Sequence, residues 1–168
     1  MKGFGHSLKN VNLRQVRSAD EPFLFRLYAS TRAEEFAAVP WSEEQLQAFL
    51  ITQFTSQQRV YDAQYPQAEH HIILYDDVAA GTIRANQTKD EIHLIDLALL
   101  PEYRNIGIGS SVLKEYLAEG RRSGRVVSLN VLKTNRAIRL YERLGFSFAG
   151  EDGAYLLMLS RPRASEET

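Results

Sequence analysis

The segment from Asp96 to Ser110 has the residue spacing with the clearest chemical meaning in this sequence. It reads DLALLPEYRNIGIGS: an apolar strand ends at Pro101, a short loop follows, and two glycines flank Ile108 as a helix begins. The first turn of a helix leaves backbone N–H groups unpaired, with a partial positive charge of about half a unit. Glycines let a phosphate approach these groups, and Arg104 adds a positive charge. The spacing therefore predicts a pyrophosphate site.

Two common nucleotide-binding motifs do not fit this turn. A Walker loop needs a lysine after its last glycine, whereas Gly109 is followed by Ser110 and Ser111. A dinucleotide-binding fingerprint needs a third glycine three residues after the second, and Val112 occupies that place. Coenzyme A is the remaining common ligand with a pyrophosphate.

The run from Arg104 to Gly109 resembles the R/Q-x-x-G-x-G/A motif of the GNAT superfamily of N-acetyltransferases. A second run, NRAIRLYERLGF from Asn135 to Phe146, resembles the second signature of the same family. One helix and one strand separate the two runs, which is also the family's spacing. The resemblance covers roughly Leu74 to Leu159.

This resemblance implies an α/β, single-domain GNAT-like fold, with a mixed, mostly antiparallel central sheet flanked by helices. It implies an acetyl-CoA-dependent N-acetyltransferase, in which a primary amine attacks the thioester directly within a ternary complex. The strand before the glycine-rich turn would separate from its neighbour and pair with the pantetheine arm, and the Leu99 N–H would hold the thioester oxygen. The implied cofactor-binding residues are Leu97, Ala98, Leu99, Arg104, Asn105, Ile106, Gly107, Ile108, Gly109, Ser110, Asn135 and Tyr141.

The second signature also implies two roles in the chemistry. Tyr141 would be the general acid that protonates the departing CoA thiolate. Without the motif, Tyr141 is more typical of a core tyrosine on an amphipathic helix. Asn135 would contact pantetheine and also form the N-cap of the helix from Asn135 to Leu144.

The general base stays open between several groups. His93 lies four residues before Leu97, where relatives often carry a glutamate or histidine, and an ordinary histidine pKa near 6.5 suits the task. Asp96 is on the same strand, but its parity places it on the other face unless a bulge intervenes. Glu91 is a further candidate, and water without a dedicated residue is the last alternative.

The sequence departs from the family pattern at Asn105, where many relatives have glycine. Asparagine tolerates left-handed backbone angles better than most residues, so we expect the turn to survive. Lys133, Arg136 and Arg139 lie near the second signature and could meet the CoA 3′-phosphate, or they could simply form a charged helix surface.

The acceptor is the least defined part of the prediction. The resemblance places the acceptor wall around Ala29–Trp41, where Glu34 and Glu35 could bind a cationic amine, although an exposed helix end with a packed Trp41 fits equally well. Small amines, amino acids, antibiotics and protein N-termini all remain candidates. His70 and His71 are expected at the surface of a strand edge.

Hydrophobic periodicity predicts the elements that position these residues. A meander of antiparallel strands is expected in the middle of the chain, and a final hairpin near its end. The predicted strands are 11–16, 71–75, 78–85, 91–100, 126–131, 146–148 and 155–159; the predicted helices are one opened by Ser18 and Glu21, then 42–64, 106–120 and 135–144. Ser42 and Gln45 form a capping box for the second helix.

Composition excludes several classes of protein. The 168 residues, 44% of them apolar, predict one domain (1–168) with a loose leader at 1–10 and a frayed tail at 161–168. A net charge of −1 disfavours nucleic acid, and no apolar run is long enough for a membrane span. No cysteine is present and no metal site is expected, so a cytoplasmic enzyme is predicted, with a homodimer left open. A non-catalytic acyl-CoA-binding or regulatory module is the alternative.

Overall fold

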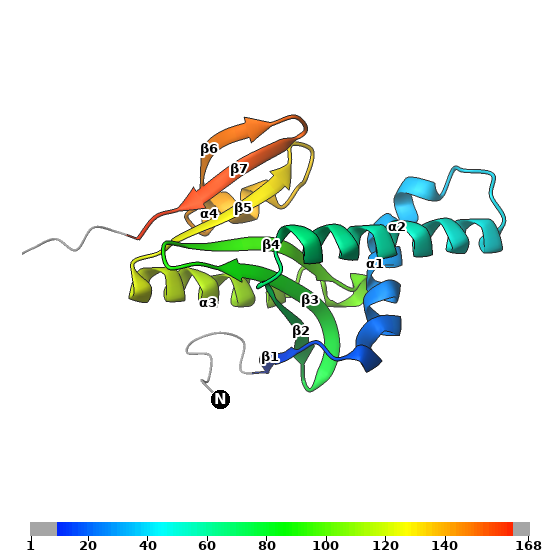
Figure 1. Ribbon diagram of the computed structural model, residues 1–168, viewed down its shortest axis with the longest axis horizontal. Coiled ribbons are helices and arrows are strands. Elements are labelled where there is room, and N and C mark those ends of the chain that lie inside the picture. The colour runs from blue at the N-terminus through cyan, green and yellow to red at the C-terminus, as the bar shows by residue number, and fades with distance from the viewer. Residues whose placement is uncertain (1–9, 163–168) are drawn as a thin grey trace, which may run out of the picture.

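A seven-stranded sheet forms the centre of the computed structural model, which describes residues 10–162 (Figure 1). The strands are β1 (Val11–Gln15), β2 (Glu69–Tyr75), β3 (Val78–Gln87), β4 (Glu91–Leu99), β5 (Val126–Leu132), β6 (Ser147–Asp152) and β7 (Tyr155–Ser160). Their order is β1-β2-β3-β4-β5-β7-β6, and every neighbouring pair is antiparallel except β4 with β5. The predicted mixed, mostly antiparallel sheet and its meander are confirmed.

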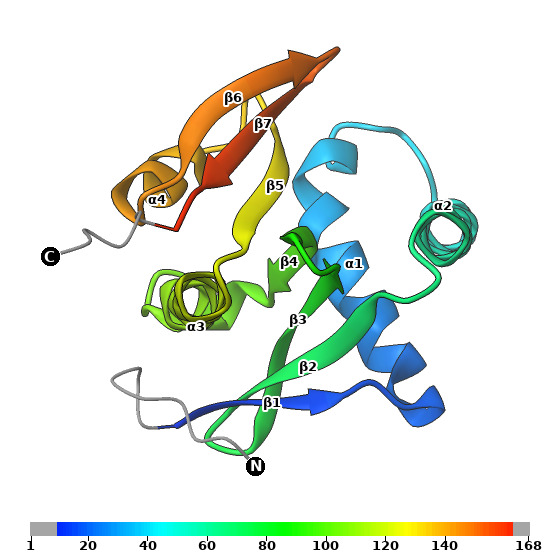
Figure 2. The same ribbon diagram turned by 60° about the vertical axis from the view of Figure 1, so that its left-hand side comes forward.

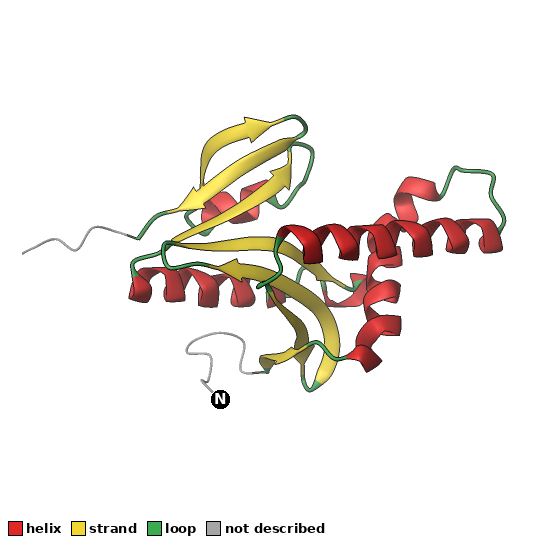
Figure 3. Ribbon diagram, viewed as in Figure 1, coloured by secondary structure: helices red, strands yellow, loops and turns green. Residues whose placement is uncertain are grey.

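Helices cover both faces of the sheet, as Figures 2 and 3 show. They are α1 (Glu21–Phe36), α2 (Glu43–Gln64), α3 (Ile108–Ser123) and α4 (Ile138–Arg143). Helices α1 and α2 lie on one face, where they share a small apolar cluster with Ile72. Helix α3 packs on the other face against β1, β4 and β5. A single α/β domain results, with α1 and α2 separated from α3 by the sheet.

The sheet divides between β4 and β5. These strands pair in parallel only from Glu91–Leu94 with Val126–Leu129. Beyond that point β5 continues along β7 and β4 continues along β3, so the two halves of the sheet open away from each other (Figure 2). Within residues 10–162, the division leaves one edge of β4, from Ile95 to Leu99, without a strand partner on the β5 side.

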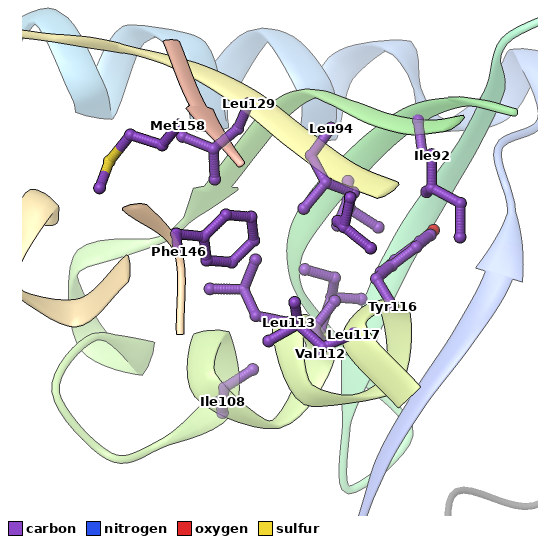
Figure 4. Close-up of a cluster of buried hydrophobic side chains, with 14 of the residues drawn as sticks. Ile92, Leu94, Ile108, Val112, Leu113, Tyr116, Leu117, Leu129, Phe146 and Met158 are labelled. Atoms are coloured by element: carbon purple, nitrogen blue, oxygen red, sulfur yellow. The ribbon is translucent and has the colours of Figure 1, made fainter. Parts of the chain in front are cut away.

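The main core lies between the sheet and α3 (Figure 4). Apolar side chains at helical spacing on α3, including Val112, Leu113, Tyr116 and Leu117, are buried against strands of both halves of the sheet. A Cβ on Gly120 would come within 2.6 Å of Val127 Cγ2, so α3 approaches β5 closely at that point. The helix therefore holds the two halves together from beneath the division.

Most predicted boundaries are close to the observed ones, with corrections at the starts of α1 and α4. The Ser42 capping box is present: the Gln45 N–H donates to Ser42 Oγ at 3.1 Å, and the Ser42 N–H donates to Gln45 Oε1 at 3.0 Å. The predicted box of Ser18 and Glu21 is wrong. A 3-10 turn at Ser18–Asp20 precedes the helix instead, and the Asp20 carboxylate closes this turn by accepting the Arg17 N–H at 2.8 Å. Asp20 is the N-cap residue of α1 by position, without a side-chain cap in the described chain.

Two predicted terminal segments extend beyond the residues that the structure describes. The leader at 1–10 is described only from residue 10, and the tail at 161–168 only to residue 162. Within residues 10–162, no helix has the length and apolar character that crossing a membrane requires.

Candidate active site

The glycine-rich turn presents a row of free backbone donors at the start of α3. The first hydrogen bond of this helix runs from the Ser111 N–H to the Gly107 carbonyl at 3.0 Å, so the amides from Ile108 to Ser110 precede the helical ladder. In the described part of the chain, no hydrogen bond uses an N–H group of residues 105–110. Such a row of amides at a helix start suits a diphosphate.

Two residues in left-handed conformations shape the turn. Asn105 has φ +61° and Gly107 has φ +92°. Asparagine adopts this region more readily than most residues, so the departure from the family's glycine leaves the turn intact, as predicted. Gly107 is the N-cap of α3 and carries the larger φ, where a side chain would strain the backbone.

Gly109 leaves space rather than fulfilling a packing need. A Cβ added there would meet only Leu99 Cδ1, at 3.8 Å, which is an ordinary contact. Packing in the free protein therefore does not require glycine at this position. The open space lies over the free amides, and it fits a phosphate group that approaches the backbone closely.

Arg104 connects the turn to the free edge of β4. Its side-chain Nε donates to the Leu99 carbonyl at 2.9 Å. The Leu100 N–H instead bonds to Ala80 of β3 at 2.9 Å, so alternation along the ladder directs the backbone groups of Leu97 and Leu99 toward the division of the sheet. The same alternation directs the backbone of Ala98 toward β3. Ala98 therefore offers no free backbone donor to the division of the sheet. It lines a separate cavity between α1, α2 and the sheet, which is described below.

A cavity of about 200 Å³ occupies the gap between β4 and β5. Leu97 lines it on the β4 side, and Val131 on the β5 side. Three tyrosines also line it: Tyr141 from α4, Tyr61 from α2 and Tyr155 from β7. Burial raises the pKa of the Tyr141 phenol, and the Asp96 charge raises it further. Tyr141 therefore keeps its proton at neutral pH and is available as a proton donor.

The prediction that Asn135 caps the helix is wrong. Helix α4 begins at Ile138, with Ala137 at its N-cap position. The Asn135 side chain instead accepts the Ala137 N–H at 2.8 Å, closing a short turn before the helix. The side chain is nevertheless at the gap between β4 and β5, where its predicted contact with pantetheine remains a proposal.

A second cavity, of about 340 Å³, lies between α1, α2 and the facing surface of β3 and β4. The wall from α1 includes Arg32 and Glu35. Four residues line both cavities: Asp96, Leu97, Leu132 and Asn135. The two cavities therefore meet at the end of the free edge of β4, so ligands in each of them would come together there.

A β-bulge places Asp96 at this meeting point. The register of β4 on β3 shifts between Leu94, opposite Ala85, and Asp96, opposite Arg84, which leaves Ile95 as the extra residue. The extra residue brings Asp96 to the face that α1 and α2 cover, so the predicted opposite parity does not apply. Burial raises the pKa of Asp96 to about 6, while the nearby Arg84 charge lowers it in part.

His93 lies away from the meeting point. Its Nδ1 is 2.7 Å from Ser128 Oγ, and its ring packs 5.7 Å from that of Tyr65. The Ser128 hydroxyl donates to Glu91, which completes a chain of polar contacts across the last paired stretch of β4 and β5. Burial lowers the pKa of His93. Neither cavity is lined by His93 or Glu91.

The expectation that His70 and His71 are surface residues is wrong. His70 is half-buried, lines the second cavity and hydrogen-bonds to Thr82 and Arg84, while His71 Nδ1 is buried without a partner. Arg84 is 6% exposed and was not identified from the sequence, although a basic residue inside an apolar strand is a signal of an unusual site.

The remaining predicted charges lie nearer the surface. Glu34 is exposed, whereas Glu35 forms an ion pair of 3.3 Å with Arg32 at the second cavity. Trp41 is 42% exposed and stacks on Phe36 with ring centroids 6.0 Å apart. Two of the three basic residues near the second signature are exposed without an ion pair in the described chain, and the third, Lys133, pairs with Glu151 at 2.9 Å.

The site thus consists of a divided sheet, a row of free amides at one end of the division, and two cavities that meet at a carboxylate. A family profile described as "Acetyltransferase (GNAT) family" matches residues 25–146, which is 122 of the 168 residues. The chain belongs to this family. Members of the family use acetyl-CoA as the acyl donor.

Solved structures share the fold at low sequence identity. An N-acetyltransferase, PaiA, from Thermoplasma acidophilum in complex with coenzyme A has 20% identity and a TM-score of 0.68, over 90% of this chain and 98% of that one. The ribosomal-protein-S18-alanine N-acetyltransferase from Escherichia coli has 24% identity and a TM-score of 0.60, over 94% and 98%. An acetyltransferase from Thermus thermophilus has 18% identity and a TM-score of 0.65, over 92% and 99%. Comparison with curated protein sequences finds no match.

Proposed function

We propose that the protein is an acetyl-CoA-dependent N-acetyltransferase that moves an acetyl group to a primary amine by direct attack in a ternary complex. The observation that carries the proposal is the meeting of the two cavities at Asp96 and Asn135. One cavity extends along the free edge of β4, and the other opens between α1 and α2. Two ligands bound at once would meet at this point, as direct transfer requires.

The chain's own groups fit coenzyme A in two places. The free amides from Asn105 to Ser110 and the Arg104 guanidinium would hold the diphosphate, and the space above Gly109 allows its approach. The backbone groups of Leu97 and Leu99 that face the gap would hold the pantetheine arm. When bound, acetyl-CoA would supply the acetyl group as a thioester with a thiolate as leaving group.

Three groups of the chain would carry the proton and charge movements. Asp96 would accept a proton from the attacking amine, and its pKa of about 6, raised by burial, leaves it ionised at neutral pH and close to the operating range. The Leu99 N–H would donate to the oxygen on which negative charge develops. Tyr141 would donate its proton to the departing sulfur.

Asp96 is preferred over His93 as the base because of where each residue lies. Asp96 lines both cavities, whereas His93 lines neither and already contacts Ser128 and Tyr65. A base must come within hydrogen-bond reach of the amine, directly or through one water molecule. Geometry therefore favours the carboxylate, although an unperturbed histidine would have the more convenient pKa.

A screen of acceptors tests the proposal. The protein is incubated with acetyl-CoA and a panel of small amines, amino acids and peptides with free N-termini, and thiol release is recorded above the rate without acceptor. We expect release that depends on the acceptor, together with a rise in the melting temperature when CoA is added, because a ligand of the native state stabilises it. Absence of any calorimetric heat with CoA thioesters would contradict the proposal. Binding without turnover for any acceptor would instead indicate a non-catalytic module.

A further inference from the structure

Two opposite charges lie side by side beneath the second cavity without pairing. Arg84 of β3 and Asp96 of β4 are directly opposite in the antiparallel register and face the same side of the sheet. Cβ atoms of such partners are about 5 Å apart, well within reach of an ion pair. Arg84 is 6% exposed and Asp96 is half-buried, yet no ion pair joins them among the described residues.

The Arg84 guanidinium is held by α2 instead. Its Nη1 donates to Asp62 at 2.9 Å and its Nη2 donates to Gln58 at 2.7 Å. The guanidinium also lies 5.2 Å from the centre of the Tyr61 ring, in cation–π contact. These three contacts come from one face of the last turns of α2, and together they hold the positive charge on that helix, outside ion-pair distance of Asp96.

The remaining contact of Arg84 is with His70, and it adds no charge. The Thr82 hydroxyl donates to the His71 carbonyl at 2.9 Å, so it accepts from His70 Nε2 at 2.8 Å. His70 Nδ1 is then the acceptor for Arg84 at 3.0 Å. Burial lowers the pKa of His70 to about 4, with the Arg84 charge adding to the effect, so His70 is neutral at working pH.

We propose that Asp62 and Gln58 are positioning residues, which hold the Arg84 guanidinium on α2 and keep it from forming an ion pair with the Asp96 carboxylate. Asp62 is suited to this role because its side chain is 74% exposed, so it supplies a negative charge from solvent without the cost of burying a second carboxylate. Neither residue belongs to the glycine-rich turn or to the second signature. The catalytic consequence rests on the proposed role of Asp96 as the base.

The consequence follows from the groups around Asp96. A carboxylate in direct contact with an arginine has its pKa lowered by about 1 to 3 units, so an ion pair would make Asp96 a weaker base. The titratable and charged groups that share its two cavities are Tyr28, Arg32 and Glu35 of α1, Tyr61 of α2, His70 of β2, Arg84 of β3, Tyr141 of α4 and Tyr155 of β7. Burial is the larger influence and raises the Asp96 pKa, while Arg84, the buried cation of this set, lowers it. The placement of Arg84 therefore sets how much of that rise is cancelled.

Replacing Asp62 tests the proposal directly. In Asp62→Asn the guanidinium loses its anionic partner and turns to Asp96, so we expect the Asp96 pKa, followed by carboxyl ¹³C NMR, to fall by about 1 to 2 units. The acid limb of kcat/KM should move to lower pH by the same amount. Asp62→Glu should restore the wild-type values, and Gln58→Leu should shift them in the same direction by less.

Two controls separate contact from a general charge effect. Glu44→Gln removes an exposed carboxylate from the first turn of the same helix and should leave the Asp96 pKa unchanged. Raising the salt concentration to about 1 M screens a through-solvent effect of the lost charge but not a buried ion pair, so the shift in Asp62→Asn should persist.

The two measurements also separate this inference from the proposed function. An Asp96 pKa that does not move in Asp62→Asn would overturn the positioning role, whatever the rates show. A pKa that moves while the acid limb of kcat/KM stays in place would support the positioning role and remove Asp96 as the base.

Discussion

The two cavities that meet at Asp96 are built in different ways. The cavity beside β4 adjoins a row of backbone groups: Leu97 lines it, and Leu99 and the free amides of the glycine-rich turn follow further along the same edge. The cavity between α1 and α2 uses side chains from separate elements, with Arg84 at its base. A backbone site constrains glycine spacing over a few consecutive residues, whereas a side-chain site draws on distant positions. This difference explains why the glycine-rich turn could be predicted from the sequence and the cavity between α1 and α2 could not.

The largest effect is expected where the two halves meet. Asp96→Asn removes the proposed base and should lower kcat by about 10² to 10⁴-fold while leaving CoA affinity nearly unchanged. Steady-state kinetics and calorimetry check the two parts. A variant that retains wild-type kcat would assign proton removal to water or to another group.

The same variant should gain stability, with a definite pH dependence. Burial raises the folded-state pKa of Asp96 to about 6 from an ordinary value near 4, so the fold favours the neutral carboxyl. Its contribution to stability is full below pH 4 and is lost as the pH rises through about 6. Asparagine mimics the neutral form, so Asp96→Asn should be more stable than wild type by about 1 to 3 kcal/mol at pH 8 and by little at pH 4. Thermal denaturation at both pH values measures the difference.

The glycine-rich turn is tested next by reversing the charge of Arg104. Arg104→Glu should weaken CoA binding by about 100-fold, because it removes a charge-assisted contact and adds repulsion toward the diphosphate. Lys114→Glu, an equivalent reversal at an exposed position further along α3, is the matched control and should change affinity little. Equal affinities for the two variants in calorimetry would show that the diphosphate lies elsewhere.

A smaller effect is expected at the phenol in the gap between the strands. Tyr141→Phe should lower kcat by about 10- to 100-fold with CoA affinity retained, because the ring still packs against Phe146 and only the proton donor is lost. The loss of kcat should be smaller when the acyl donor carries a better leaving group than the CoA thiolate. Loss of thermal stability without loss of kcat would instead identify Tyr141 as a core tyrosine.

The smallest effect is expected at Gly109, where a substitution tests whether the open space serves packing or a ligand. Gly109→Ala adds a Cβ that meets only Leu99 Cδ1 at 3.8 Å, so the fold should be unchanged or slightly more stable, as alanine favours helix. The same methyl group lies over the free amides and should weaken CoA binding by about 10-fold. Gly150→Ala, whose Cβ has nothing within 4 Å, should leave affinity unchanged.

Local patterns account for the parts of the structure that the sequence predicted. The Ser42 capping box marks the start of α2, and apolar spacing identified the buried face of α3. These signals act over a few residues of chain. The same is true of Gly107, whose φ of +92° is a requirement that its own residue type reveals.

Long-range and single-residue effects account for the parts that were missed. Ile95 has nothing in its type to mark it as the extra residue of a bulge, yet it decides which face Asp96 occupies. Arg84 finds its α2 partners 22 and 26 residues earlier in the chain, at a distance over which periodicity carries no information. The start of α4 was missed because the Asn135 side chain closes a turn of its own instead of capping the helix.

The division of the sheet also has a bearing on aggregation. An unpaired strand edge at the rim of a sheet invites pairing with another chain, and proteins usually shorten, charge or cover such edges. The free edge of β4 lies instead inside the molecule, opposite β5 and above α3. The neighbouring half of the sheet therefore stands opposite an edge that, at the rim of a sheet, would be open to pairing with a second molecule.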